Sequence, residues 1–182
     1  MDIFDIKRCL ESMSIIVDSR EQPTRRARDR YKTFGCPYDR GKLNYGDYTY
    51  NFTLPNGIQT YDIQQPIDPC VSIERKMNIG ELCQCFGQGR DRFEREFERA
   101  AMQGGKIYLL VENASWEKIY NGSYNSRFHP NALVASTLGW STRYGFQIIF
   151  CRPGTTGKMI RDILYRELKA RLERGDYDGV GV

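Results

Sequence analysis

The alternation of apolar and polar positions predicts a chain in which strands and helices follow one another. Short runs of β-branched and aromatic residues are typical of strands, and they occur at residues 14–18, 44–54, 71–76, 106–112 and 146–150. Apolar residues that recur every three or four positions are typical of amphipathic helices, and they occur at residues 91–102, 130–144 and 158–172. This succession predicts an α/β domain in which the strands at 106–112 and 146–150 are buried.

Proline and glycine mark two of the segments between these elements. Pro23 is expected to open a basic helix that reaches about Phe34, because proline fits the first turn of a helix. The turn signal Pro55-Asn56-Gly57 predicts a hairpin made of residues 48–54 and 58–63.

The two ends of the chain carry little patterning. Residues 1–12 are expected to form a short leading helix or a frayed arm, and the glycine-rich residues 175–182 a disordered tail. One domain is expected over residues 13–174, because a chain of 182 residues with 40% hydrophobic content can bury a single sizeable core.

Composition favours a protein inside the cell, either cytoplasmic or, in a eukaryote, nuclear, with no membrane partner. No run approaches the roughly 18 consecutive apolar residues of a membrane span, and the N-terminus lacks the apolar core of a signal peptide. The six cysteines have no disulfide spacing, so reduced thiols are expected. His129 is the single histidine, which disfavours a structural zinc site.

Basic residues concentrate in two segments, although the net charge is only +4. The first segment leads to Asp47 and contains Arg20, Arg25, Arg26, Arg28, Arg30, Lys32, Arg40 and Lys42. The second contains Arg90, Arg92, Arg95 and Arg99. Arginines suit contacts with nucleic-acid phosphates, which supply affinity without sequence information. A solvated surface is the alternative for any one of them.

One short stretch brings an acid and an amine together. Alternate residues of a strand share a face, so Glu74 and Lys76 are predicted to lie side by side while Arg75 points away. Asp47, which follows Gly46, would add a second carboxylate. Two carboxylates with an open side suit Mg²⁺, which prefers a few carboxylate oxygens together with waters and substrate phosphate. The stretch is therefore a candidate site where a divalent metal meets a scissile phosphate.

Three ordered motifs give the chain a family resemblance. They are Ile16-Val17-Asp18-Ser19-Arg20-Glu21, Gly46-Asp47-Tyr48 and Ile73-Glu74-Arg75-Lys76. The likeness continues through Gly89-Arg90-Asp91-Arg92-Phe93-Glu94, the strand at 107–112 and the helix start His129-Pro130-Asn131, and it spans about residues 13–172. In this order the motifs resemble the nuclease domain of the XPF family of structure-specific DNA endonucleases. The resemblance implies a restriction-endonuclease-like (PD-(D/E)XK) fold, in which a mixed sheet is flanked by helices.

The resemblance also implies roles for single residues. Asp47 and Glu74 would hold Mg²⁺ or Mn²⁺ with the backbone carbonyl of Arg75, and Lys76 would orient the water or steady the developing charge. Asp18 and Glu21 would be catalytic residues near the metal. From the residues alone an alternative is open, in which Asp18 caps the following turn and Glu21 pairs with an arginine. The arginines expected on DNA are Arg20, Arg25, Arg26, Arg75, Arg90 and Arg92.

Three features depart from the family pattern. Gly80 stands where the family has an aspartate, and Glu81 comes one place late, which on a helix rotates its side chain by about 100°. The hairpin at about residues 52–69 reads as an insertion. Relatives usually carry a tandem helix-hairpin-helix module after the nuclease domain, and a single-domain form without it is expected here. DNA recognition would then depend on the nuclease domain, a partner or a second copy.

The expected function is a Mg²⁺- or Mn²⁺-dependent DNA endonuclease, selective for branched, flap or forked DNA in repair, recombination or replication. The alternative is a catalytically silent DNA-binding subunit of a nuclease complex. Gly80 favours that alternative, and the intact Gly-Asp and Glu-Arg-Lys residues favour the enzyme. The helices at 130–144 and 158–172 are rich in apolar residues, so they either form a homodimer interface or complete the core.

Overall fold

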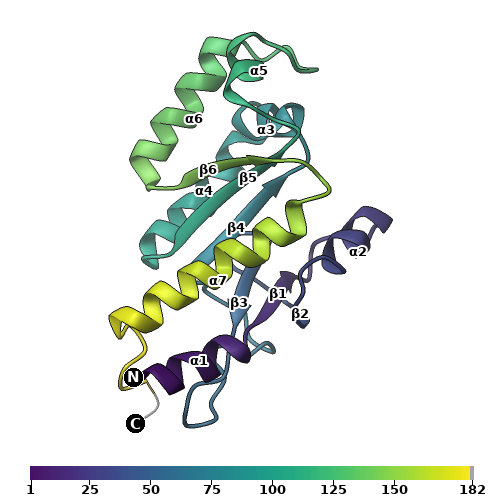
Figure 1. Cartoon of the computed structure of the whole chain (residues 1–182). Coiled ribbons are helices and arrows are strands. Elements are labelled where there is room, and N and C mark those ends of the chain that lie inside the picture. Colours follow the sequence, from purple (N-terminus) through teal and green to yellow (C-terminus); the bar gives the residue numbers. More distant parts are fainter. Residues whose placement is uncertain (181–182) are drawn as a thin grey trace.

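A mixed sheet forms the centre of the molecule in the computed structural model, which describes residues 1–180 (Figure 1). Its described strands are ordered β2-β1-β3-β4-β5-β6. They are β1 (Ser14–Asp18), β2 (Tyr38–Gly41), β3 (Tyr48–Asn51), β4 (Val71–Lys76), β5 (Lys106–Glu112) and β6 (Gln147–Cys151). The helices are α1 (Ile3–Glu11), α2 (Arg25–Tyr31), α3 (Ile79–Phe86), α4 (Arg90–Met102), α5 (Trp116–Tyr120), α6 (Pro130–Tyr144) and α7 (Thr156–Arg174).

The directions of the strands bring several strand ends to one edge of the sheet. β1 and β4 both run antiparallel to β3, whereas β4, β5 and β6 run parallel to one another. The carboxyl ends of β1, β4 and β5 therefore lie beside the amino end of β3. Sites in open α/β sheets commonly lie just outside strand ends, so this edge is where chemistry is expected.

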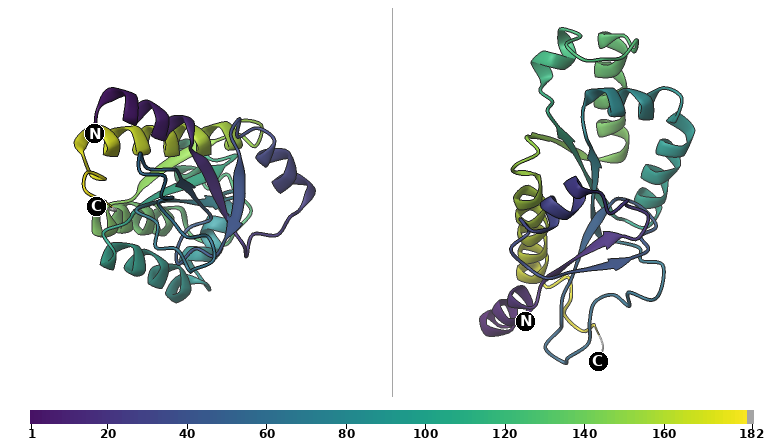
Figure 2. Two further views of the ribbon diagram at one scale, coloured as in Figure 1. Left: turned by 90° about the horizontal axis from the view of Figure 1, so that it is seen from below. Right: turned by 90° about the vertical axis from the view of Figure 1, so that its right-hand side faces the viewer.

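Helices cover both faces of the sheet, α1 and α7 on one and α3, α4 and α6 on the other (Figure 2). Successive residues of a strand alternate between faces, and β5 shows the consequence. Its Leu110 joins a core with Leu164 of α7, whereas Leu109 joins a second core with Trp140 of α6. Burial on both faces explains why this strand is apolar throughout. No helix in the described part of the chain is long and apolar enough to cross a membrane.

The two edge strands differ from the sequence prediction. β2 has no predicted counterpart, because residues 38–40 are exposed and lack apolar alternation. It pairs in parallel with β1. β6 occupies the position of a predicted buried strand, yet Ile148, Ile149 and Phe150 are only half-buried because β6 is the other edge of the described sheet.

Two predicted elements are shorter than expected. α2 begins after Thr24, whose side chain caps it, and ends at Tyr31, so Pro23 lies outside the helix. The predicted hairpin closes through an antiparallel bridge between Thr53 and Gln59. Its first strand is reduced to β3 (Tyr48–Asn51), and residues 58–63 form no second regular strand.

Both ends of the described chain pack on the body of the domain. The first residues form α1, which lies against α7. Tyr177 shares a hydrogen bond of 2.7 Å with the hydroxyl of Tyr50 and contacts Phe52 edge to face. The amino group of Met1 forms an ion pair with Asp178 at 2.9 Å. These contacts differ from the disordered tail expected from residue 175 onward, and residues 181–182 of that tail lie outside the described part.

Candidate active site

Four predicted site residues meet at the edge where the strand ends converge. Asp18 ends β1, Asp47 precedes β3, and Glu74 and Lys76 lie at the end of β4. The N–H of Asp18 donates to the carbonyl of Asp47 at 2.8 Å, and the N–H of Asp47 donates to the carbonyl of Ile73 at 2.8 Å. The backbone of the sheet therefore fixes the spacing of these residues.

Together with Glu21, these residues line a pocket of about 240 Å³. The opposite wall comes from α4. The lining residues are Asp18, Arg20, Glu21, Gly46, Asp47, Glu74, Lys76, Arg92, Arg95, Glu96 and Arg99. The four residues from α4 follow the i, i+3, i+4, i+7 spacing of one helix face, while Phe93 and Phe97 on another face are buried in the core. All five residues predicted to be catalytic thus face one polar pocket.

Gly46 gives Asp47 its position. Its φ is +75°, and a Cβ at this residue would lie 2.6 Å from the Cβ of Ser72. Only glycine meets both the left-handed backbone and the close approach to β4. The N–H of Gly46 donates to Oε1 of Glu96 at 2.8 Å. This contact gives Glu96 a place in the site that the sequence reasoning missed.

Glu74 and Lys76 lie side by side, as the strand spacing predicts. The Lys76 ammonium donates to the Glu74 carboxylate, and the two residues are 8% and 4% exposed. The ammonium also lies 5.0 Å from the ring centre of Phe93. Burial opposes the charged amine, but Glu74 and Asp47 outweigh it and raise the pKa of Lys76 above its usual value. The lysine is therefore a buried positive charge at the pocket.

Asp47 and Glu74 are carboxylates that resist ionising together. Asp47 is half-buried, and its Oδ2 accepts the N–H of Arg75 at 2.8 Å. Burial, and then the charge of Glu74, raise the pKa of Asp47 to about 8. Burial also raises the pKa of Glu74 to about 7, although Lys76 opposes the shift. Lys76 alone therefore does not balance the pair, and one more positive charge would.

A divalent ion fits this donor set. Carboxylate oxygens are the ligands that Mg²⁺ and Mn²⁺ prefer, and the excess negative charge of the pair favours a cation. In the described part of the chain, no three Asp, Glu, His or Cys side chains are grouped to hold a metal by themselves. Asp47 and Glu74 would therefore share the ion with waters or a substrate phosphate, as is usual for Mg²⁺.

Asp18 and Glu21 line the pocket but have other partners. Asp18 accepts the N–H of Arg20 at 2.8 Å, which caps the turn, and forms an ion pair with the same side chain. Glu21 forms an ion pair with Arg30. These contacts match the alternative stated from the sequence, in which Asp18 caps the following turn and Glu21 pairs with an arginine. Asp18 is balanced by Arg20, which lines the pocket, and Glu21 by Arg30, which is buried. The catalytic roles of Asp18 and Glu21 stay predictions.

Arg75 points to the opposite face of β4, as predicted, into a buried charge network. Its guanidinium lies 3.4 Å from Glu112 and 3.8 Å from Glu21. Arg30 bonds to Glu21 and lies 3.9 Å from Glu112. Each of the two arginines is therefore paired with both glutamates. Tyr48, the residue after Asp47, donates to Glu21. The network therefore connects α2, β3, β4 and β5 directly behind the pocket.

The arginines predicted to contact DNA divide by exposure. Four are exposed to solvent: Arg20, Arg25, Arg26 and Arg92. Arg75 is held in the charge network, and Arg90 lies over the ring of Trp140 at 5.1 Å. Arg95 and Arg99 line the pocket and extend its basic rim. The exposed residues and this rim are the surface available to phosphates.

Glu81 stabilises the start of α3. Its Oε2 accepts the N–H of Met77 at 2.6 Å, and its own N–H donates to Oδ1 of Asn78 at 2.9 Å. The arrangement is close to a capping box, except that Glu81 accepts from the residue before the N-cap Asn78 rather than from Asn78 itself. Neither Gly80 nor Glu81 lines the candidate pocket, so Glu81 does not stand in for the family aspartate.

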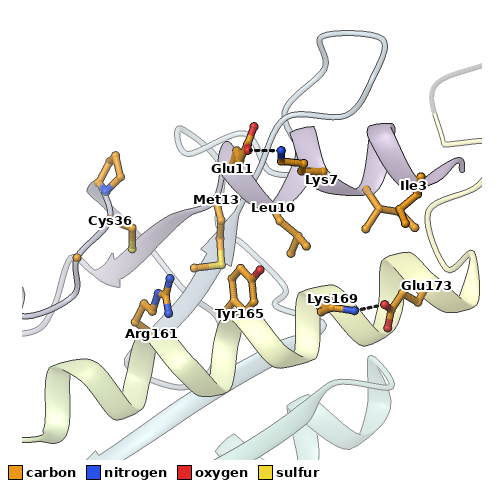
Figure 3. Close-up of a pocket in the computed structure, with 13 residues that line it drawn as sticks. Ile3, Lys7, Leu10, Glu11, Met13, Cys36, Arg161, Tyr165, Lys169 and Glu173 are labelled. Atoms are coloured by element: carbon orange, nitrogen blue, oxygen red, sulfur yellow. Dashed lines mark hydrogen bonds and ion pairs between the residues drawn. The ribbon is translucent and has the colours of Figure 1, made fainter.

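A larger hollow lies away from these residues, between α1 and α7 (Figure 3). Its volume is about 770 Å³, and side chains such as Ile3, Leu10, Met13 and Tyr165 line it. None of the predicted site residues does. The chemistry is therefore concentrated in the smaller pocket at the strand ends.

An acid pair with a lysine at the strand ends of a restriction-endonuclease-like α/β sheet defines a class of nuclease-type domains. A comparison with protein-family models matches the ERCC4 domain over residues 17–162. The chain belongs to the ERCC4 domain family, which confirms the resemblance drawn from its three motifs. No curated protein matches the chain.

Solved structures of XPF from Aeropyrum pernix are similar to this fold. Two of them, one in complex with DNA, match at 18% identity with a TM-score of 0.58. The first match covers 85% of this chain and 61% of that chain, and the match to the DNA complex covers 92% and 76%. The chain thus spans about three fifths of the first structure. The likeness confirms the predicted mixed sheet flanked by helices.

Proposed function

We propose that the chain is a metal-dependent DNA endonuclease. The observation that carries the proposal is the pocket itself, which joins Asp47, Glu74 and Lys76 to a rim of arginines. Membership of the ERCC4 domain family supports it. One of the similar structures, that of XPF from Aeropyrum pernix, holds DNA.

Asp47 and Glu74 would hold Mg²⁺ or Mn²⁺, with the carbonyl of Arg75 as a further ligand. When bound, such an ion polarises a phosphate oxygen and lowers the pKa of a coordinated water. Lys76 places a positive charge where the phosphate gains negative charge, or orients the attacking water. The N–H of Arg75 holds Oδ2 of Asp47, so Oδ1 is the oxygen that would bind the ion.

The arginine rim would bind the DNA backbone. Arg20, Arg92, Arg95 and Arg99 border the pocket and would grip phosphates on either side of the scissile one. Phosphate contacts do not distinguish one base sequence from another. Selectivity would therefore depend on the shape of the DNA. Branched, flap or forked substrates formed in repair, recombination or replication are the proposed targets.

A catalytically silent DNA-binding subunit is the second candidate. The observation in its favour is that Gly80 replaces an acid of the family pattern and Glu81 turns to the cap of α3 instead. The intact acid pair and lysine favour the enzyme.

The experiment is a cleavage assay with Mg²⁺ or Mn²⁺ on duplex, single-stranded, flap and forked DNA. Wild type is expected to cut, and EDTA, Glu74→Gln and Lys76→Ala are expected to lower the rate by at least about 10²-fold. Glu94→Gln is the control, because Glu94 lies on α4 but pairs with Arg143 at 2.8 Å. DNA binding without cleavage by wild type would favour the silent subunit, and full activity of Glu74→Gln would remove the site assignment.

We also propose a homodimer through the C-terminal elements in a cytoplasmic or nuclear protein. Leu133, Trp140, Ile160 and Leu164 complete the core, so they cannot supply the interface. Leu138, which is 46% exposed, and the half-buried apolar residues of β6 remain available. An edge strand with apolar side chains is a common place for two chains to pair.

A further inference from the structure

We infer that Glu96 is a positioning residue of this active site and that it acts on Asp47 through the N–H of Gly46. The inference deepens the proposed function and rests on it. Glu96 lies on α4, 50 positions from Gly46, and its side chain reaches the wall of the same pocket. Its Oε1 accepts the Gly46 N–H at 2.8 Å.

The turn that Glu96 holds is the one that presents Asp47. Gly46 is buried and has a φ of +75°, a conformation that it needs in order to pass Ser72. The sheet holds the next N–H, that of Asp47, through the carbonyl of Ile73. The N–H of Gly46 has no acceptor within the sheet, and Glu96 supplies one. Without it, a buried donor would lack a partner and the turn would lose its contact with α4.

A carboxylate suits this task better than a neutral acceptor. A hydrogen bond from a backbone N–H to an ionised oxygen is shorter and stronger than a neutral one. Glu96 also shares its helix face with Arg92, Arg95 and Arg99, and these cations offset the repulsion between Glu96 and Glu74 in the same pocket. The same contact fixes α4, and with it the arginine rim, against the strand ends. Residues that orient a metal ligand commonly change metal affinity by about 10–100-fold when removed.

Two substitutions separate positioning from direct ligation. Glu96→Gln keeps an oxygen that accepts from Gly46 N–H but removes the charge, whereas Glu96→Ala removes both. A positioning role depends mainly on the acceptor, so glutamine should rescue most of what alanine loses. A ligand role depends on the carboxylate, so glutamine should fail as alanine does. Glu94→Ala is the matched control, because Glu94 on the same helix bonds to Arg143 and Tyr144 instead.

The test is Mn²⁺ titration of the full chain by calorimetry, with thermal unfolding as the check on folding. Glu96→Ala is expected to weaken Mn²⁺ binding at least about tenfold, Glu96→Gln by no more than about threefold, and Glu94→Ala not at all. Amide exchange at Gly46 supplies a readout without metal. It should be faster in Glu96→Ala and close to wild type in Glu96→Gln.

The outcomes of the Mn²⁺ titration distinguish the role of Glu96 from the proposed function. Mn²⁺ binding by Glu96→Ala equal to wild type overturns the inference and leaves the proposed function in place. Equal loss in the alanine and glutamine variants overturns it in favour of a role for the charge. Wild-type protein that binds no Mn²⁺ overturns the metal assignment of the proposed function, and the role of Glu96 in metal positioning with it.

Discussion

At the scale of single residues, the ion pair of Lys76 and Glu74 is poorly explained by stability alone. Taking two charges out of water costs several kcal/mol per ion, and well-packed apolar residues would stabilise a strand as well or better. Asp47 adds a further carboxylate next to this pair. The charge imbalance makes sense at a site that receives a cation and a phosphate.

The two carboxylates predict how the metal-free protein responds to pH. The pKa of Asp47 rises from 3.8 to about 8 on folding, and that of Glu74 from 4.5 to about 7. For each carboxyl group, in the pH range between its unfolded and its folded pKa, the folded state holds a proton that the unfolded state has released. The free energy of unfolding therefore falls as pH rises through this range. With EDTA present, denaturant unfolding is expected to show a lower free energy of unfolding at about pH 8 than at about pH 5.

Asp47→Asn is the check on the sign of this effect. The amide keeps an oxygen for the N–H of Arg75 but cannot ionise, so the variant should be more stable than wild type at about pH 8 and should depend less on pH. Saturating Mn²⁺ should remove the loss in wild type. A metal-free wild type that gains stability over this range would contradict the assignment.

The candidate site could be predicted from sequence only where its geometry is local. The adjacency of Glu74 and Lys76, and the opposite direction of Arg75, follow from the two-residue period of a strand. Glu96 lies in a regular amphipathic pattern, and its role depends on a contact 50 positions away. Glu112 ends a strand 37 positions from Arg75. An acid at the end of an apolar strand was the available signal, and it did not specify a partner.

At the scale of elements, burial decided which strands and helices the sequence could predict. β4 and β5 are covered on both faces and carry apolar runs, and α4, α6 and α7 carry apolar stripes. β2 has three exposed residues and depends on its pairing with β1, which no local pattern encodes. α2 ends at Tyr31 because the chain turns there to reach β2. Contacts between distant segments therefore determine β2 and the end of α2, which the local sequence pattern did not predict.

The charge network behind the pocket is predicted to hold α2 against the sheet. Arg30→Met would leave Glu21 and Glu112 with one arginine fewer, and losing one partner of a buried pair commonly costs about 3 kcal/mol or more. Arg25→Met, at a side chain 92% exposed on the same helix, should change stability by less than about 0.5 kcal/mol. Denaturant unfolding measures both. If the two variants are equally stable, the charge network does not stabilise the packing of α2 against the sheet.

Two helical glycines predict opposite effects of alanine. A Cβ at Gly157 would lie 2.4 Å from the carbonyl oxygen of Arg30, so Gly157→Ala should destabilise the protein by about 1–3 kcal/mol. Gly139 is exposed within α6, and a Cβ there meets nothing within 4 Å. Gly139→Ala should therefore stabilise the protein by about 0.5–1 kcal/mol. Thermal unfolding measures both variants. It compares the close contact between α7 and α2 at Gly157 with the open face of α6 at Gly139.

At the scale of the whole molecule, the arginine rim predicts how DNA affinity depends on salt. Each arginine that neutralises a phosphate contributes about one unit to the slope of log affinity against log salt. Arg92→Gln, Arg95→Gln and Arg99→Gln should each lower that slope by about one and weaken binding equally for different sequences. Arg161→Gln, beside the hollow between α1 and α7, is the control. An unchanged slope in all three variants would place the DNA elsewhere, and fluorescence anisotropy across a salt series measures it.

The edge strand β6 carries the prediction of oligomeric state. It pairs with β5 on one side, and its Ile149, which packs on the α7 face of the sheet, is only half-buried. If two chains meet there, sedimentation at micromolar concentration should give about twice the monomer mass of 21.2 kDa, and Ile149→Arg should return the monomer. Phe4→Arg is the control, because Phe4 is 74% exposed on α1, which precedes β1 towards the opposite edge of the sheet from β6. A monomer at every concentration would exclude the homodimer, and a dimer that Ile149→Arg leaves intact would place the interface away from this edge. In the first case, two active sites could not act on one DNA through self-association.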